Sequence, residues 1–143
     1  MTPEERARAC AEQMWAADAA SQGMGMALER IAPGQARLSM DVAGYMVNGY
    51  GICHGGYIFS LADSAFAFAC NTTGEVAVAQ HCAVTFVRPA RLGERLVAQA
   101  REQHRARRSG TYDVRVETAD GELVALFRGD CRTTGARFEE RPT

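Results

Sequence analysis

The sequence contains no lysine, so arginine supplies all 16 of its basic residues. These nearly balance 17 acidic residues and leave a formal net charge of −1. Because there is no excess of positive charge, the composition excludes an overall field that would attract nucleic acid or an anionic membrane surface. Arginine is then the only permanently cationic side chain available to recognise a phosphate group.

The cysteines are irregularly spaced. The sequence has five: Cys10, Cys53, Cys70, Cys82 and Cys131. Their number is odd, their spacing fits no metal site, and no signal peptide precedes them. We therefore expect free thiols in the cytoplasm and no bound metal. Long apolar runs are absent too, because Asp63 interrupts the nearest approach to the roughly 20 residues of a membrane helix. No membrane association is predicted.

What the sequence does contain is one strongly apolar stretch, between Asn48 and Asn71. A glycine-rich loop opens it, and the apolar residues that follow recur at the 3.6-residue spacing of a helix and also fill its other sides. A helix that is apolar on nearly every face is predicted to lie inside the protein. Asp63 is the single ionisable residue within it. A buried carboxylate is costly unless it is paired or used, so Asp63 is a candidate for the functional site.

The rest of the chain predicts one more helix and a set of strands. Thr2 and Glu5 predict a capping box for an N-terminal helix that ends near Ala20. The tail from 133 to 143 is polar and is expected to fray. Short turns between the later strands predict that they are antiparallel neighbours. Alternating apolar and polar residues predict strands over 26–31, 35–42, 76–87, 96–103, 111–118 and 123–131.

These elements predict a single α+β domain over the 143 residues. An antiparallel sheet would curl around the central helix, with the additional helix at about 3–20 outside it. One sheet cannot wrap a helix completely. The exposed flank of the helix and the open edges of the sheet therefore predict a homo-oligomer.

The junction between the glycine loop and the helix is the first candidate for chemistry. Gly55 and Gly56 place backbone N–H groups at a helix N-terminus, where they can hold the oxyanion of an acyl transfer or can simply allow a tight turn. Asp63 is the second candidate, as a general base or nucleophile. The structural alternative is a carboxylate hydrogen-bonded to the backbone, to Ser60 or to Ser64.

Spacing constrains how these two candidates can act together. Gly55 and Asp63 are eight residues apart, which is roughly 12 Å along a helix. Oxyanion donors and the attacking group must both lie within roughly 3 Å of one reacting carbonyl. If both residues act in one reaction, they must come from different subunits, and the active site lies at a dimer interface.

Other residues near these candidates are less specific. His54 is either a general base or, as we favour, a residue that fixes the loop by hydrogen bonds. Asn48 either orients water or the carboxylate, or is a turn residue. The thiol of Cys53 is not expected to be a nucleophile. The basic segment 105–110, with Arg88 and Arg91, either binds phosphates or is a solvated hairpin tip.

The segments that carry these features resemble a known family. HGGYIFSLAD at 54–63, AVTFVRPARLGERL at 83–96, RRSGTYDV at 107–114 and LVALFRGDC at 123–131 are similar to PaaI-type phenylacetyl-CoA thioesterases of the hotdog superfamily. The resemblance implies a hotdog fold, dimers that commonly pair into tetramers, and hydrolysis of an acyl-CoA in phenylacetate catabolism. No separate cofactor is implied, because coenzyme A is part of the substrate.

The resemblance also implies roles for single residues. Asp63 matches the family's nucleophile or general base, Gly55 the amide that polarises the thioester carbonyl, and Asn48 the residue that positions carbonyl or water. Related enzymes often carry a hydroxyl residue on the next strand, a role here unfilled or taken by Gln80. Further substrate contacts are expected from His54, Gly56, Arg107, Arg108, Ser109 and Gly110, the last four near the nucleotide end of the coenzyme.

Two other functions fit parts of this pattern. A hotdog enoyl-CoA hydratase or dehydratase would use His54 with Asp63, but it usually has a catalytic histidine on a longer, differently spaced loop. A non-catalytic acyl-CoA sensor generally carries an added DNA-binding segment, for which the N-terminal helix is too short.

Overall fold

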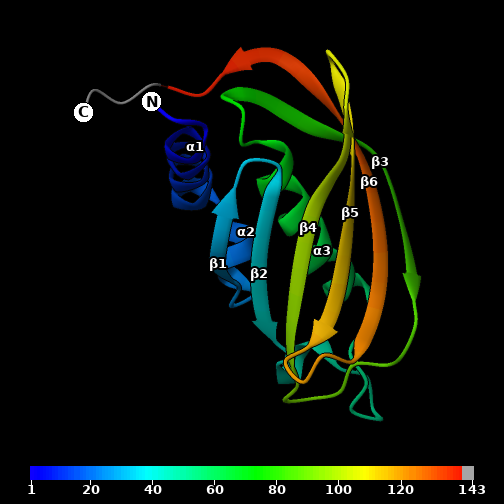
Figure 1. The fold of residues 1–143 in the computed structure, drawn as a ribbon. Helices are drawn as coiled ribbons and strands as arrows, with labels where there is room; N and C mark the ends of the chain where they lie inside the picture. Colours follow the sequence, from blue (N-terminus) through cyan, green and yellow to red (C-terminus); the bar gives the residue numbers. More distant parts are fainter. Residues whose placement is uncertain (140–143) are drawn as a thin grey trace.

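A computed structural model describes residues 1–139, in which one curved antiparallel sheet wraps around a central helix, α3 (Gly55–Cys70) (Figure 1). The sheet has six strands in the order β1-β2-β4-β5-β6-β3. The strands are β1 (Ala27–Ala32), β2 (Gln35–Asp41), β3 (Glu75–Phe86), β4 (Arg95–Arg105), β5 (Ser109–Thr118) and β6 (Leu123–Arg137). The smaller helices are α1 (Pro3–Ala17), α2 (Ala19–Gly23) and the 3-10 turn η1 (Gly44–Met46). The predicted α+β hotdog arrangement is confirmed.

Helix α3 is the core of the molecule, as its all-round apolar character predicts. Leu61, Ala62 and Ala65 have no exposed surface, and Phe66 packs between Tyr112 and Phe127, each with a ring-centroid distance of 5.8 Å. Burying a large apolar side chain stabilises the fold by about 1.5–3 kcal/mol. The helix is therefore fixed tightly against the inner face of the sheet.

The N-terminal helix begins where the sequence predicts but ends earlier. Thr2 and Glu5 form the predicted capping box, and α1 then stops at Ala17 rather than at Ala20. The carboxylate of Asp18 accepts a hydrogen bond from the Ser21 N–H at 3.0 Å and starts the separate short helix α2. Aspartate competes well for such a cap and poorly for a helix interior, which explains the break.

The strand order corrects one prediction. β3 and β4 follow each other in sequence, yet they are not neighbours: β3 pairs with β6, and β4 lies between β2 and β5. The segment 87–94, called here the crossover, therefore passes across the open end of the sheet instead of forming a hairpin. The hydrophobic pattern sets which face of a strand is buried, but it does not set which strand lies beside it.

The C-terminal tail is a second correction. β6 continues to Arg137, with Thr133 opposite Ala77 and Arg137 opposite Glu75, so residues 133–137 do not fray. β3 is 12 residues long, and the backbone groups of its first residues need hydrogen-bond partners, which the extended β6 supplies. The predicted fraying of 140–143 lies outside the described residues.

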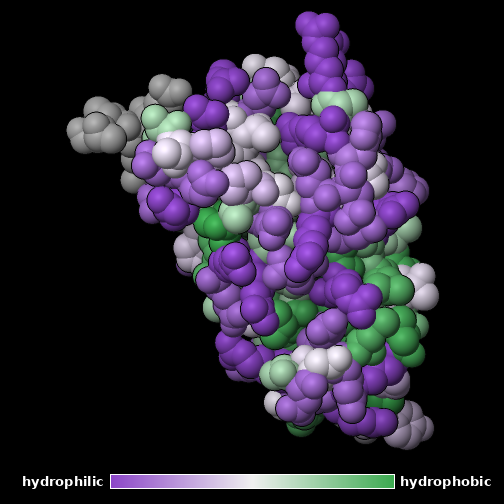
Figure 2. All heavy atoms as spheres, in the orientation of Figure 1, coloured by the Kyte–Doolittle hydropathy of each residue, from purple (hydrophilic) through white to green (hydrophobic). Residues whose placement is uncertain are grey.

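One edge of the sheet is long and largely exposed. β3 forms one edge and is exposed along most of its length, with Val78 at 53% and Phe86 at 49%. Figure 2 shows the outer face of the sheet as mainly hydrophilic, with apolar residues gathered on the side of β6 and β3. Leu126, on β6, is 42% exposed. No helix among residues 1–139 is long and apolar enough to cross a membrane.

Candidate active site

The start of α3 presents free backbone donors. His54 is the residue before the helix, and the amides of Gly55 and Gly56 donate no hydrogen bond within residues 1–139. The first N–H groups of a helix have no partner inside it, and the helix dipole adds partial positive charge there. The arrangement can therefore bind an oxyanion, provided that a substrate carbonyl reaches it.

The structure gives a reason for glycine at position 55. A Cβ atom built there would lie 2.7 Å from Cζ of Phe86, closer than any real side chain tolerates. Phe86 is the last residue of β3, and its ring rests against the backbone of the helix start. Glycine thus allows the strand and the helix start to touch.

Asp63 lies on the flank of α3 that faces β3. Its carboxylate has one hydrogen-bond partner in the described chain, a long contact of 4.0 Å from the Cys82 thiol to Oδ1. Ser60 instead donates to the Gly56 carbonyl at 2.9 Å, and Ser64 shares a hydrogen bond with Ser21 at 2.9 Å. The structural alternative, in which either serine holds the carboxylate, is therefore wrong.

The electrostatics suit a base at Asp63. Burial raises the pKa of Asp63 above its ordinary value of 3.8. Burial, with the neighbouring Asp63 and Asp130, also raises the pKa of Cys82, so the thiol keeps its proton and can donate it in a hydrogen bond. A carboxylate with few partners and a raised pKa is a stronger base than one held by several donors.

The distance between the glycine amides and the Asp63 carboxylate follows from two independent estimates. α3 is unbroken from Gly55 to Asp63, so the eight residues span about 12 Å. Phe86 touches Gly55 and Cys82 touches Asp63, and these two residues are four apart on β3, which is about 13 Å. The two groups do not meet within one chain. Each chain carries two halves of a site.

The loop before the helix is held by its backbone. The His54 N–H donates to the Met46 carbonyl at 2.8 Å, and its side chain makes no cap. Oδ1 of Asn48 accepts from the amides of Tyr50 at 2.9 Å and Ile52 at 3.1 Å, which closes a turn. His54 thus holds the loop through its backbone, as expected of the residue, while its imidazole makes no hydrogen bond within residues 1–139. Asn48 forms the turn that its residue type allows.

Two other candidates near the helix are also placed. Burial raises the pKa of Cys53, and its thiol donates to the His54 carbonyl at 3.4 Å, which agrees with a structural role. Gln80 is exposed and sits at a bulge in β3, between the residues that pair with Cys131 and Asp130. A bulge re-aims a side chain next to its strand partners, so Gln80 is free to face a ligand.

The basic segment lies at the opposite end of α3. Arg107, Arg108 and Ser109 are exposed at the turn between β4 and β5, and Gly110 is buried. Arg105 donates to the carbonyl of Cys70, the last residue of α3, at 3.2 Å. Fifteen residues separate this end of the helix from Gly55, about 22 Å. One chain does not bring the basic segment to its own glycine amides.

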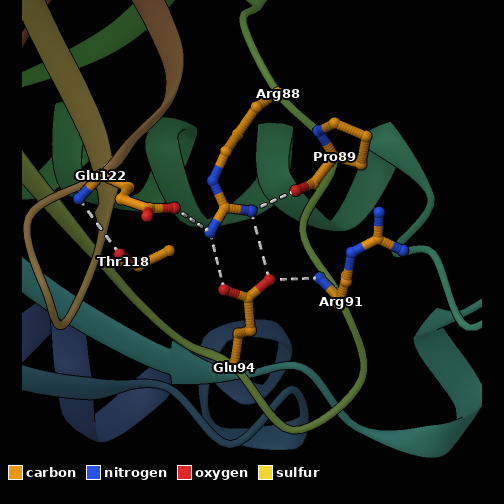
Figure 3. Close-up of polar contacts among 6 residues, drawn as sticks. All are labelled: Arg88, Pro89, Arg91, Glu94, Thr118 and Glu122. Atoms are coloured by element: carbon orange, nitrogen blue, oxygen red, sulfur yellow. Dashed lines mark hydrogen bonds and ion pairs between the residues drawn. The ribbon is translucent and has the colours of Figure 1, made fainter.

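Arg88 differs from the sequence expectation of a phosphate ligand. Its guanidinium is already engaged by Glu94 and Glu122, each at 2.8 Å (Figure 3). Residues 1–139 hold no cluster of side chains suited to a metal ion. Phe86 and Cys82 were not identified from the sequence, although their alternation along β3 places both on one face of that strand.

Comparisons with known proteins agree with this fold. A family model described as the thioesterase superfamily matches residues 50–125. The acyl-coenzyme A thioesterase PaaI of Escherichia coli (strain K12) is 40% identical over 125 residues, which cover 87% of this chain and 89% of that protein.

Solved structures extend the likeness over nearly the whole chain. The E. coli PaaI protein from the phenylacetic acid degradation operon matches with a TM-score of 0.94 and 37% identity, covering 96% of this chain and 100% of that one. A Streptococcus mutans UA159 protein bound to acetyl CoA matches with a TM-score of 0.75 and 27% identity, covering 79% of this chain and 91% of that one. The family model spans more than half of the chain, and the chain belongs to the thioesterase superfamily.

Proposed function

We propose that this protein is an acyl-CoA thioesterase that hydrolyses phenylacetyl-CoA or its ring-hydroxylated forms to the free acid and coenzyme A, as part of phenylacetate catabolism. The observation that carries the proposal is the pair of half-sites on α3: unpaired glycine amides at its start and a half-buried, sparsely hydrogen-bonded Asp63 two turns later. The 40% identity to an acyl-coenzyme A thioesterase supports the substrate class.

The chemistry follows from these groups. The Gly55 N–H polarises the thioester carbonyl and stabilises the oxyanion that forms on it. Asp63 either takes a proton from water as the water attacks the carbonyl carbon, or attacks that carbon itself to give an anhydride that water then opens. The C–S bond breaks, and the thiolate of coenzyme A takes up a proton. Asn48, His54, Gly56 and Gln80 line the approach of the substrate.

The site is complete only when two chains meet. Because Gly55 and Asp63 are about 12 Å apart in one chain, the dimer must bring the Gly55 of one subunit beside the Asp63 of the other. The exposed edge strand β3 supports this assembly, since it carries residues that touch both half-sites and leaves its outer backbone groups unpaired. We propose further pairing of dimers into a homotetramer.

The basic segment at 105–110 has a role in the same proposed reaction. Its residues Arg107, Arg108, Ser109 and Gly110 bind the nucleotide end of the coenzyme, which lies far from the thioester, and the arginines contact the phosphates. No additional cofactor is required. Five free cysteines suit a reducing compartment, which supports a cytoplasmic location.

Hydrolysis of phenylacetyl-CoA, followed by release of the free thiol, tests the role of Asp63. We expect Asp63→Asn and Asp63→Ala to lower kcat by at least about 10²-fold, the usual scale for loss of a general base. Asp113→Asn removes a carboxylate from the outer face of the sheet, where Arg128 holds it at 2.6 Å, and serves as the control. An Asp63 variant as active as the wild type would refute the assignment.

Mixed dimers test the shared site. Asp63→Ala and Gly55→Pro proteins should each be inactive, but a mixed dimer contains one site with both native groups. Random exchange should then restore about a quarter of wild-type activity, because half the dimers are mixed and each has one working site. If subunits exchange and no activity returns, Gly55 and Asp63 do not act across the interface.

A further inference from the structure

The crossover (87–94) passes directly beside the loop that leads into α3. We propose that Arg88 is a positioning residue for the oxyanion-binding amide of Gly55, acting through the crossover. The inference rests on the proposed function, because it assigns Arg88 a part in the same reaction. It also replaces the role that the sequence suggests for Arg88, that of a phosphate ligand.

Arg88 ties three parts of the chain together (Figure 3). Its Nη2 atom lies 2.8 Å from a carboxylate oxygen of Glu94, at the end of the crossover, and 2.8 Å from one of Glu122, in the turn between β5 and β6. Its Nη1 atom also donates to Glu94 at 3.3 Å and to the carbonyl of Pro89. Glu94 in turn accepts the Arg91 N–H at 2.7 Å. The guanidinium thus closes the crossover into a compact loop.

The pair of Arg88 with Glu94 is less solvated than a surface pair, whereas the side chain of Glu122 is 66% exposed. The side chains of Arg88 and Glu94 are only 27% and 26% exposed, so water screens them less than it screens an exposed pair. A planar guanidinium can reach both carboxylates and a carbonyl at once, which a lysine ammonium on its flexible stem does less well. The Arg88 contact also holds the pKa of Glu94 below its ordinary value, so the pair is charged at neutral pH.

The closed crossover holds the glycine loop by backbone hydrogen bonds. The Cys53 N–H donates to the Ala90 carbonyl at 2.8 Å, and the Leu92 N–H donates to the Gly51 carbonyl at 3.0 Å. Ile52 and Arg91 form an isolated antiparallel bridge between them. Gly55 follows Cys53 by two residues. The glycine loop therefore positions the amide of Gly55, and Arg88 fixes the shape of the crossover that holds this loop.

A second contact reaches the same amide from the other side. Phe86, two residues before Arg88, rests against the backbone of Gly55. The amides of Val87 and Arg88 both donate to the Val124 carbonyl, at 2.8 and 3.3 Å, which fixes the end of β3 on β6. Releasing Arg88 would loosen the crossover on one side of Gly55 while β3 stays in place. The expected effect is a displaced oxyanion donor in a folded protein.

The experiment compares Arg88→Met with Arg128→Met, which removes an equally bidentate arginine from the outer face of the sheet. We expect Arg88→Met to lower kcat on phenylacetyl-CoA roughly tenfold, which equals about 1.4 kcal/mol of transition-state stabilisation. KM should stay within about twofold, because the Gly55 amide binds the oxyanion of the transition state more strongly than the ground-state carbonyl. Arg88→Lys should recover part of kcat, and Arg128→Met should change neither constant.

A measurement without substrate tests whether Arg88 holds the crossover, independently of the reaction. Hydrogen exchange should become faster at the amides of Cys53 and Leu92 in Arg88→Met and stay unchanged in Arg128→Met. Should Arg88→Met fail to fold, Arg88→Lys and Glu122→Gln replace it in both measurements, with smaller changes expected in the same direction.

The outcomes are distinguishable. Unchanged kcat with a raised KM would overturn the proposal and make Arg88 a ligand of the coenzyme phosphates. Unchanged kcat and unchanged exchange would show that the crossover does not depend on Arg88. A wild type without thioesterase activity, or a fully active Asp63→Asn, would instead remove the proposed function, while exchange at Cys53 would still report whether Arg88 holds the loop.

Discussion

Alanine at position 55 adds one methyl group to the start of α3, where the structure leaves no space for it. The new Cβ would lie 2.7 Å from Cζ of Phe86 and 3.1–3.2 Å from the two neighbouring ring atoms. Carbon atoms attract best at about 3.5–4.0 Å, so the helix start or the ring must move by about 1 Å. A misplacement of that size in a catalytic group costs on the order of 10² in rate. We expect Gly55→Ala to lose activity to the extent that the helix start moves with its amide, since the 49% exposed ring of Phe86 can take up part of the shift.

Phe86→Ala removes the obstacle and makes the cause testable. That background removes the three atoms nearest to a Cβ at position 55, which is the first residue of α3. Proline suits this position, because the missing N–H has no partner within the helix. His54 has φ −61° and ψ 137°, a conformation that a residue before proline adopts readily. The pair Gly55→Ala/Phe86→Ala and Gly55→Pro/Phe86→Ala therefore differs chiefly in one amide donor.

The assay is kcat for phenylacetyl-CoA by free-thiol release, with Phe86→Ala alone as the baseline. We expect the alanine double variant to approach that baseline and the proline one to stay about 10²–10³-fold below it, the usual worth of one oxyanion donor. Thermal melts confirm that both are folded. Equal activity of the two double variants would refute the role of the Gly55 amide. Failure of Phe86→Ala to rescue Gly55→Ala would refute the crowding argument.

Three further outcomes follow from contacts in the core and at the carboxylate. Because burial raises the pKa of Asp63, its ionised form opposes folding. Asp63→Asn should therefore raise the melting temperature at pH 7. This gain should vanish below pH 3.8, where the carboxyl group is protonated in both the folded and the unfolded protein. Gly129→Ala would place a Cβ 2.8 Å from three ring atoms of the buried Phe66, so denaturant titration should show a loss of about 1–3 kcal/mol, smaller in combination with Phe66→Leu. Ser64→Ala breaks the link to Ser21 and should cost about 0.5–1.5 kcal/mol in the same titration, more than Ser60→Ala, whose hydroxyl bonds only within α3.

Local patterns predicted the elements that local forces control. The capping box at Thr2 and Glu5 formed as predicted, and the alternation in β5 placed Val114 and Val116 in the core. The same reasoning failed where two local preferences compete. Asp18 fits the apolar stripe poorly and caps α2 instead, so the first helix ends early.

Long-range partners explain the other differences. The sequence of β3 is mostly apolar although the strand is largely exposed, and nothing in it indicates β6 as its neighbour or the extension of β6 to Arg137. Arg88 lies six residues before Glu94 and 34 before Glu122, with no periodicity that links them. Such contacts depend on how the chain folds, since the energy of an ion pair depends on the distance between the charges in space and not on their separation in sequence.

By itself the sequence determined that one apolar helix would be buried, that it would start at a glycine pair and that it would carry a single carboxylate. It also determined that Gly55 and Asp63 stand too far apart to meet, because the rise of a helix is the same in every protein. Only the tertiary structure decided that Phe86 closes on Gly55, that Cys82 is the partner of Asp63 and that Arg88 holds the crossover. These contacts join residues that lie far apart in the chain, and packing of the whole sheet around α3 brings them together.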